Sequence, residues 1–342
     1  MSLSFIKKRR VNVAVVGLGF MGVTHLRAYL KNSSARVVAV CGLGRLPENG
    51  LLRGVAGNIK KSDDIQLGAN VRVYRRYEEL LADPEVELVD LCTPTALHSS
   101  QAIAALAAGR HVLCEKPLAQ QAAEARKVLK AAAASRAFLM PAMCMRFWPG
   151  WSGLKKVVAD RTYGAVRAAN FRRLSEMPAW GNAGSHPGGA LLDLHIHDTD
   201  FVHWLFGRPR GVFSTGSAGA AGAIHHVITQ YHYPGGPAVS AEGSWLLARG
   251  FHMSFTLHCE RATLDFDLAR GAEALRVDEA GKKTRTLKLD RGDGYEAEIR
   301  YFVDCVARGR KPEIVTARDA LAALEICEAE EKSVRTGRWI KL

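Results

Sequence analysis

Short apolar runs and helical stretches alternate along the first part of the chain. Val11 to Val16 is a nearly continuous run of β-favouring residues that ends at Gly17, which predicts a strand buried on both faces. A helical stretch follows from Met21 to Leu30. The alternation continues with expected strands at 36–41, 71–74, 86–92, 111–114 and 138–145, and expected helices at 77–82, 99–108 and 120–135. This order predicts an α/β fold, a Rossmann doubly wound parallel sheet.

The pattern changes in the second part, where longer strands alternate apolar and polar positions. A Pro-Gly-Gly-Pro turn at 234–237 separates two such runs and predicts a hairpin. We expect further strands at 252–258 and 262–268, and helices at 190–206, 295–308 and 316–336. The pattern predicts a C-terminal α+β domain with an open, mostly antiparallel sheet. The predicted domains are therefore residues 1–147 and 148–342, and the last helix can pack back on the first domain.

Length and composition add to this division. With 342 residues, two domains are the prior expectation. The seven cysteines lack CxxC spacing, which favours reduced thiols in a cytoplasmic protein. No apolar run reaches the ~18–20 residues of a membrane span, and the basic stretch at 7–10 is not followed by the apolar region of a secretory signal. We therefore expect no membrane partner.

The formal net charge of +13 allows two interpretations. One is nucleic-acid binding, and the other is an enzyme that attracts anionic ligands such as a dinucleotide. The basic residues are spread along the chain, and no basic stretch is interleaved with aromatic residues. We therefore expect a small anionic ligand and no nucleic acid.

The first predicted strand runs into a glycine motif, GLGFMG, at 17–22. A G-x-G-x-x-G sequence between a buried strand and a helix is typical of dinucleotide binding. Gly17 permits the tight turn, Gly19 lets the backbone approach a pyrophosphate, and Gly22 allows close helix–sheet packing. The phosphates would then meet the positive end of the helix. Phe20 and Met21 are counted with the three glycines as cofactor-binding candidates.

The second predicted strand bears on the choice between NAD and NADP. NAD-binding chains usually carry an acidic residue after this strand, where it contacts the ribose hydroxyls. This chain has Gly42 there, and Arg45 follows where a 2′-phosphate could be bound. The sequence therefore slightly favours NADP. Glu48 or another loop residue could instead take the acidic role.

Two further segments carry candidate catalytic groups. Lys116 follows the fifth predicted strand, at the sheet edge where ligands bind, and could stabilise an alkoxide or move a proton. Asp193 and His197 are four residues apart, which places both on one helical face as a carboxylate–imidazole pair. A solvated lysine and a capped amphipathic helix are the alternatives. A metal site with His195 remains possible, although helical zinc pairs prefer i, i+4 spacing; we expect no metal.

The ordered set GLGFMG, CEKP at 114–117 and GGALLDLHIHDTDFVHWLFG at 188–207 resembles the glucose–fructose oxidoreductase/inositol dehydrogenase (Gfo/Idh/MocA) family. CTPTALH at 92–98 and the closing helix are similar too. The resemblance implies an NAD(P)-dependent oxidoreductase acting on a sugar, polyol or related alcohol. It implies a homodimer or homotetramer formed through the C-terminal sheet. It also implies that Lys116 is the catalytic lysine, that Asp193 and His197 are the D-x-x-x-H pair, and that the cofactor is lined additionally by Thr93, Pro94, His98 and Glu115.

The chain departs from the family at His195, where many relatives have Gly, and at Gly42. The mechanism we expect uses His197 as general base, Lys116 as partner of the developing alkoxide and Asp193 as the orienting group. Candidates for the substrate wall are Arg146, Arg172 and Trp180, with Trp148 and Trp151 beside them. Two rivals remain: an enzyme whose tightly bound nicotinamide serves glycosidic cleavage or elimination, and a cofactor-sensing regulatory protein without catalysis.

Overall fold

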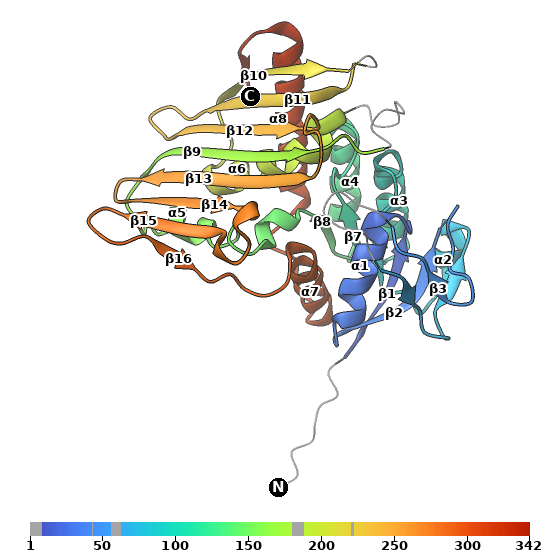
Figure 1. Ribbon diagram of the computed structural model, residues 1–342. Coiled ribbons are helices and arrows are strands. Elements are labelled where there is room, and N and C mark those ends of the chain that lie inside the picture. The colour runs from blue at the N-terminus through green and yellow to red at the C-terminus, as the bar shows by residue number, and fades with distance from the viewer. Residues whose placement is uncertain (1–8, 43, 56–62, 180–187, 220–221) are drawn as a thin grey trace. The chain divides into compact units, whose positions relative to one another are not determined.

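The computed structural model describes residues 9–42, 44–55, 63–179, 188–219 and 222–342, and the chain divides into two units (Figure 1). Unit 1 comprises residues 1–119, 123–142 and 295–317, and unit 2 comprises 120–122, 143–294 and 318–342. The predicted boundary after residue 147 thus lies a few residues beyond the observed one. Residues 295–317, which were assigned to the second domain, belong to unit 1.

Unit 1 contains a six-stranded parallel sheet, in the order β5-β2-β1-β6-β7-β8. This is the strand order of the Rossmann fold, so that prediction is confirmed. The central strands are buried and mostly apolar, as a sheet covered on both faces requires, and the buried polar residues Asp90 and Glu115 on β6 and β7 are exceptions. The strands are β1 (Val11–Val16), β2 (Ala35–Cys41), β5 (Arg72–Tyr74), β6 (Leu88–Leu91), β7 (His111–Glu115) and β8 (Leu139–Ala142).

The helices of unit 1 follow the predicted pattern, and a helix from late in the chain, α7, joins them. They are α1 (Phe20–Lys31), α2 (Tyr77–Ala82), α3 (Thr95–Ala107), α4 (Ala122–Ala134) and α7 (Gly294–Ala307), and β3 (Leu51–Leu52) pairs with β4 (Ile65–Gln66). Helix α3 begins four residues before the predicted start at Ser99, directly after Pro94, whose carbonyl accepts from Leu97 N–H. The penultimate helix, α7, returns to unit 1, where Tyr295 lies beside His25 and Glu296 pairs with Lys31.

Unit 2 is built on a nine-stranded sheet in the order β16-β15-β14-β13-β9-β12-β11-β10-β17. Neighbouring strands are antiparallel except β9 and β12, which confirms the mostly antiparallel prediction. The strands are β9 (Val166–Ser175), β10 (Gly211–Ala218), β11 (Ile224–His232), β12 (Ala238–Ser244), β13 (Phe251–Cys259), β14 (Ala262–Asp267), β15 (Leu275–Glu279), β16 (Arg285–Leu287) and β17 (Ile340–Lys341).

The helical elements of unit 2 include three that the periodicity did not predict, namely η1, α5 and η4. The helical elements are η1 (Cys144–Phe147), α5 (Leu154–Ala159), η3 (Leu191–His195), α6 (Ile196–Phe206), η4 (Leu268–Glu273) and α8 (Ala317–Thr336). The predicted strand 138–145 ends at Ala142 because the 3-10 turn η1 starts at Cys144. The predicted helix 190–206 opens as the π-helix η3 and continues as α6. Such π-turns inside α-helices are rare and often lie at functional sites.

An aromatic cluster forms the core of unit 2. The fully buried ring of Trp151 packs against Phe171, Phe201, Phe255 and Phe266, with centroid distances of 5.0–5.9 Å. Trp151 was a candidate for the substrate wall, and the structure places it in this core instead. Within the described ranges, no helix combines the length and apolarity that crossing a membrane requires. Assembly through the nine-stranded sheet stays a prediction.

Candidate active site

The glycine motif forms the turn that its spacing predicts. Gly17 has a φ of +89°, and a Cβ there would lie 2.4 Å from the carbonyl oxygen of Cys92. A Cβ on Gly22 would lie 1.8 Å from the carbonyl oxygen of Gly17, so the turn and the helix touch through bare backbone. Gly19 is exposed, and a Cβ there would meet nothing within 4 Å. The turn thus leaves open the one glycine that the sequence assigned to phosphate approach.

Helix α1 starts directly at this turn and has an uncapped N-terminus. Gly19 is the residue before the helix, and no side chain caps it. The first N–H groups of a helix have no partner within the helix, and they carry its positive dipole end. The residues present therefore fit the pyrophosphate of a dinucleotide, which would accept from these N–H groups. Phe20 and Met21 contribute two of them and have half-buried side chains.

The end of β2 explains why no acidic residue stands at Gly42. A Cβ on Gly42 would lie 2.6 Å from the carbonyl oxygen of Arg45, so the returning backbone excludes a carboxylate side chain at this position. Gly42 N–H donates to the carbonyl of Tyr74, which fixes the loop to β5. Arg45 is half-buried.

His98 joins the segments that follow β6 and β7. It is 1% exposed, its Nδ1 lies 2.7 Å from the carbonyl oxygen of Pro117, and its Nε2 lies 2.7 Å from that of Thr93. Burial lowers the pKa of His98. The two carbonyls favour the charged form and raise the pKa, but burial outweighs them. His98 was expected to line the cofactor, and this stays a prediction; in the structure both ring nitrogens face backbone carbonyls in the interior.

Other residues of these segments differ in how open they are. Thr93 donates from Oγ1 to Gln101 Oε1 at 2.6 Å, whereas Pro94 is exposed. Lys116 is half-buried, and its peptide bond to Pro117 is cis. Of these residues, Pro94 and Lys116 are accessible to a ligand. His98 connects the two segments through the backbone carbonyls of Thr93 and Pro117.

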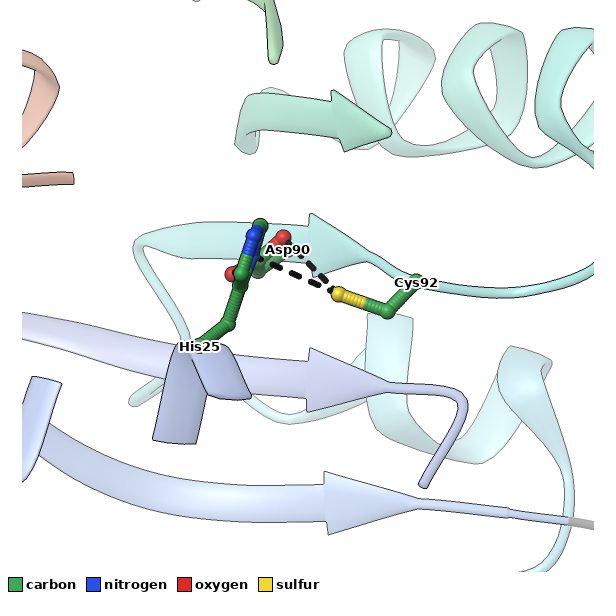
Figure 2. A group of neighbouring side chains, drawn as sticks. All are labelled: His25, Asp90 and Cys92. Carbon is green, nitrogen blue, oxygen red and sulfur yellow. Dashed lines mark hydrogen bonds and ion pairs between the residues drawn. The ribbon is translucent and has the colours of Figure 1, made fainter. Parts of the chain in front are cut away.

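A buried polar cluster, which the sequence analysis did not predict, lies beneath the strand ends (Figure 2). His25, in α1, is fully buried, and its Nδ1 lies 2.8 Å from Oδ2 of Asp90 on β6. Its Nε2 lies 3.1 Å from Oε1 of Glu115 at the end of β7. The thiol of Cys92 lies 3.4 Å from His25 Nδ1 and donates to Asp90 Oδ1 at 3.5 Å.

The geometry of the sheet brings the two carboxylates together. Asp90 pairs in register with Leu113, two residues before Glu115. Because side chains alternate along a strand, Asp90 and Glu115 point to the same face of the sheet, and the ring of His25 lies between them. Glu115 was expected to line the cofactor. The structure turns its side chain, which is 7% exposed, toward His25, and its place in the cofactor site stays a prediction.

The charges in this cluster stabilise one another. Burial lowers the pKa of His25, but Asp90 and Cys92 raise it by more, so that the pKa stands well above its ordinary value. Burial raises the pKa of Glu115, but the hydrogen bond and charge of His25 and the charge of Lys116 outweigh it, so that the pKa falls. Burial, with Asp90, raises the pKa of the Cys92 thiol. These directions favour a charged His25 beside the Glu115 carboxylate, with a neutral thiol at Cys92.

Three members of the cluster lie as close together as metal ligands do. The ligand atoms of His25, Asp90 and Cys92 are all within 4.8 Å of one another. Their contacts, at 2.8–3.5 Å, are also those of direct hydrogen bonds between protonated and unprotonated groups. Within this group of three, the Asp90 carboxylate is the partner of both the His25 ring at Nδ1 and the Cys92 thiol.

In unit 2, Asp193 lies in the π-helix η3 and His197 in the first turn of α6, and both are half-buried. Trp245 Nε1 donates to Asp193 Oδ2 at 3.3 Å. The ring of Trp245 is 1% exposed and packs with Ala190 and Leu194. Trp245, which directly follows β12, therefore holds the Asp193 carboxylate in place. Sequence reasoning missed it, because nothing in the pattern links positions 193 and 245.

Buried ion pairs anchor the helix that carries His197. Asp198 accepts from Arg173 Nε at 2.9 Å and from Nη2 at 3.0 Å. Asp200 accepts from Arg146 Nε at 2.9 Å and from Nη2 at 2.6 Å. Arg146 was a candidate for the substrate wall, and this is wrong: its side chain is 1% exposed and bound by Asp200.

His195 belongs to the same interior. It is fully buried, and its Nε2 lies 3.3 Å from the hydroxyl of Tyr231 and 3.4 Å from Oε1 of Glu330 on α8. A Cβ on Gly243 would lie 2.6 Å from His195 Cβ, so a glycine on β12 makes room for this ring. His195 is thus a buried link between η3, β11 and α8, which removes it from the surface where a substrate could contact it.

The remaining three substrate candidates have different outcomes. Trp148 is half-buried and stays a candidate. Arg172 is half-buried on β9 and donates from Nε to Glu242 Oε2 at 2.7 Å across to β12. It stays a candidate. Trp180 lies outside the described residues.

Comparison with known proteins decides the family. Residues 11–143 match the family model of the Gfo/Idh/MocA oxidoreductases, described as an oxidoreductase family with an NAD-binding Rossmann fold. Residues 151–265 match the model of the GFO/IDH/MocA C-terminal domain. The chain belongs to the Gfo/Idh/MocA family.

Relatives of this Gfo/Idh/MocA chain include several dehydrogenases. It is 33% identical over 236 residues to trans-1,2-dihydrobenzene-1,2-diol dehydrogenase of Mus musculus, a match that spans 66% of each chain. It is 26% identical over 345 residues to myo-inositol 2-dehydrogenase of Thermotoga maritima, across 97% of this chain and 98% of the relative. A levoglucosan dehydrogenase solved with NADH and levoglucosan superposes with a TM-score of 0.82 at 21% identity, covering 97% of this chain and 99% of that one. The last likeness shows the shared fold.

Proposed function

We propose that this protein is an NAD(P)-dependent dehydrogenase that transfers hydride between the nicotinamide and a secondary alcohol of a sugar, polyol or related compound. The observation that carries the proposal is the open glycine turn at the uncapped start of α1, on the same sheet edge as Lys116. The family's dehydrogenases support the substrate class: the relatives named above act on inositol, levoglucosan and a cyclic diol.

The catalytic groups we propose are Lys116, Asp193 and His197. His197 removes the hydroxyl proton, Lys116 donates a hydrogen bond to the developing alkoxide, and Asp193 orients the base. The Trp245 N–H on Asp193 Oδ2 supports the orienting role, because it restricts the carboxylate to one direction. When bound, the nicotinamide supplies the hydride acceptor for this chemistry.

The first test is a screen of polyols, sugars and cyclic diols with NAD and with NADP, following the absorbance of the reduced nicotinamide. Lys116→Ala and His197→Ala should each lower kcat by ~10²–10⁴-fold, the usual contribution of a general acid or base. Binding of the cofactor should persist in both variants. Lys127→Ala and His232→Ala, at exposed positions of α4 and β11, are the matched controls and should keep the wild-type rate.

Near wild-type turnover of either catalytic variant contradicts its assigned role. Cofactor binding without turnover on any of these alcohols contradicts the dehydrogenase and favours a sensor. Cofactor that stays with the protein through gel filtration favours the enzyme with a tightly bound nicotinamide.

We further propose that NADP is the preferred cofactor. The Arg45 carbonyl blocks an acidic side chain at position 42, and the Arg45 guanidinium is then the group available for a 2′-phosphate. Arg45→Ala should weaken NADPH binding roughly tenfold or more, as expected for a lost hydrogen bond to a charged group, and leave NADH binding unchanged. Fluorescence titration of the reduced cofactors measures both constants. Arg53→Ala removes an exposed arginine that pairs with Asp64 and is the control; tighter NADH than NADPH binding in the wild type would overturn the choice.

A further inference from the structure

The backbone of Lys116 is tied to the buried cluster through one carboxylate. Lys116 N–H donates to Glu115 Oε2 at 3.0 Å. The other oxygen of that carboxylate, Oε1, lies 3.1 Å from His25 Nε2. Glu115 therefore links the imidazolium on α1 to the amide of the residue that we propose as catalytic.

The ring of His25 is itself fixed on its far side. Its Nδ1 faces Asp90 Oδ2 at 2.8 Å, and the ring is fully buried. With a carboxylate at each nitrogen, the ring neither rotates nor releases a proton without leaving a buried charge unpaired. The chain Asp90–His25–Glu115 is thus a rigid, charged connection from β6, through α1, to the end of β7.

The segment after Lys116 is held independently. The carbonyl oxygen of Pro117 lies 2.7 Å from His98 Nδ1 on α3. The two peptide groups that flank the Lys116–Pro117 step are therefore secured by two buried histidines, one on each side. His25 differs from His98 in that its helix begins at the glycine turn.

We propose that His25 is a positioning residue for Lys116, acting through Glu115. Because α1 carries both the phosphate-binding turn and His25, one helix sets the place of the dinucleotide and the place of the Lys116 backbone. The inference rests on the proposed catalytic role of Lys116. It assigns to His25, Asp90 and Glu115 the function of holding the Lys116 backbone in place.

The two ring nitrogens of His25 can be tested separately. In His25→Asn the shorter amide reaches where Nδ1 lies, so it keeps the contact with Asp90 and loses the contact with Glu115. In His25→Gln the longer amide reaches where Nε2 lies and keeps the contact with Glu115. A role that is merely structural is damaged by both variants, whereas positioning through Glu115 is damaged mainly by His25→Asn.

The first readout is hydrogen exchange of the Lys116 amide by mass spectrometry, which needs no substrate. Exchange should accelerate about tenfold or more in His25→Asn and stay within about threefold of wild type in His25→Gln. His111→Asn, at the other end of β7, is the matched control and should leave this amide unchanged. Equal exchange in wild type and His25→Asn overturns the proposal. If His25→Asn does not fold, Glu115→Ala removes the acceptor directly, and unchanged exchange there overturns it equally.

The second readout is catalysis, with the alcohol that the screen identifies. His25→Asn should lower kcat about tenfold per folded molecule and change the dissociation constant of the reduced cofactor less than about threefold, and His25→Gln should largely restore kcat. Equal kcat in the two variants overturns the positioning role. Lys116→Ala is measured in parallel: if it keeps full activity, the catalytic proposal has failed, whereas an inactive Lys116→Ala beside a fully active His25→Asn shows that only the positioning inference has failed.

Discussion

Both units bury pairs of charged side chains that hold their elements together, but the cation of the pair differs between the two units. Unit 1 places an imidazolium, His25, between Asp90 and Glu115 beneath the strand ends. Unit 2 fixes α6 with two guanidinium groups, Arg146 on Asp200 and Arg173 on Asp198. A guanidinium stays protonated at every physiological pH, whereas an imidazole can lose its proton. The anchors of unit 2 are therefore permanent, and the anchor of unit 1 depends on pH.

The largest expected effect comes from breaking a permanent anchor. Arg173→Met leaves the Asp198 carboxylate buried without its partner and should reduce the free energy of unfolding by about 3–5 kcal/mol. Urea unfolding measures the loss. Adding Asp198→Leu should recover most of it, because removing both charges also removes the desolvation penalty. If Arg173→Met alone were as stable as wild type, the Arg173–Asp198 pair would not contribute to the stability of the fold.

The pH-dependent anchor should give an intermediate effect. The folded pKa of His25 lies above its unfolded value of about 6.5, so its contribution to stability is complete below that pH and is lost as the pH rises toward the folded pKa. The advantage of wild type over His25→Gln should therefore shrink between pH 6.5 and 8.5, by at most about 1.4 kcal/mol per pH unit. Urea unfolding at several pH values tests this. Two curves that run parallel would contradict a charged His25.

The smallest loss of stability is expected at Arg172, the residue next to Arg173. Arg172 and Arg173 are neighbours on β9, so their side chains point to opposite faces of the sheet. The side chain of Arg172 is 43% exposed and pairs with Glu242, whereas that of Arg173 is 4% exposed. Arg172→Ala should cost about 0.2–1 kcal/mol in the same unfolding measurement. A cost equal to that of Arg173→Met would show that exposure does not separate the two anchors.

The sequence predicted unit 1 well because its signals are local. Buried parallel strands are continuous apolar runs, and the glycine motif combines its strand, turn and helix within a dozen residues. The roles of Gly17 and Gly22 followed from their spacing, and the structure shows the close backbone contacts that require them. The position of Lys116 at a strand end followed in the same way.

The errors arose where partners are distant in the chain. Arg146 was taken for a substrate contact because its partner, Asp200, is 54 residues away. The contact of Glu115 with His25 was not predicted, because periodicity cannot pair residues that lie on two different elements. The π-turn at Leu191–His195 left no mark either, since its residues fit an α-helical pattern equally well. Predictions based on residue type find the chemistry, but which charged groups are buried is decided by the tertiary fold.

The return of residues 295–317 to unit 1 has a consequence for how the protein is made. Ile299, Phe302 and Val303 of α7 are fully buried, so the nucleotide-binding unit lacks part of its interior until these residues have been synthesised. A ribosome that has translated the six strands of the Rossmann sheet still holds an unfinished unit, and eight of the nine strands of the unit 2 sheet are translated before the missing helix. A chain that ends before α7 therefore carries all six strands of the Rossmann sheet but lacks Ile299, Phe302 and Val303 from the interior of unit 1.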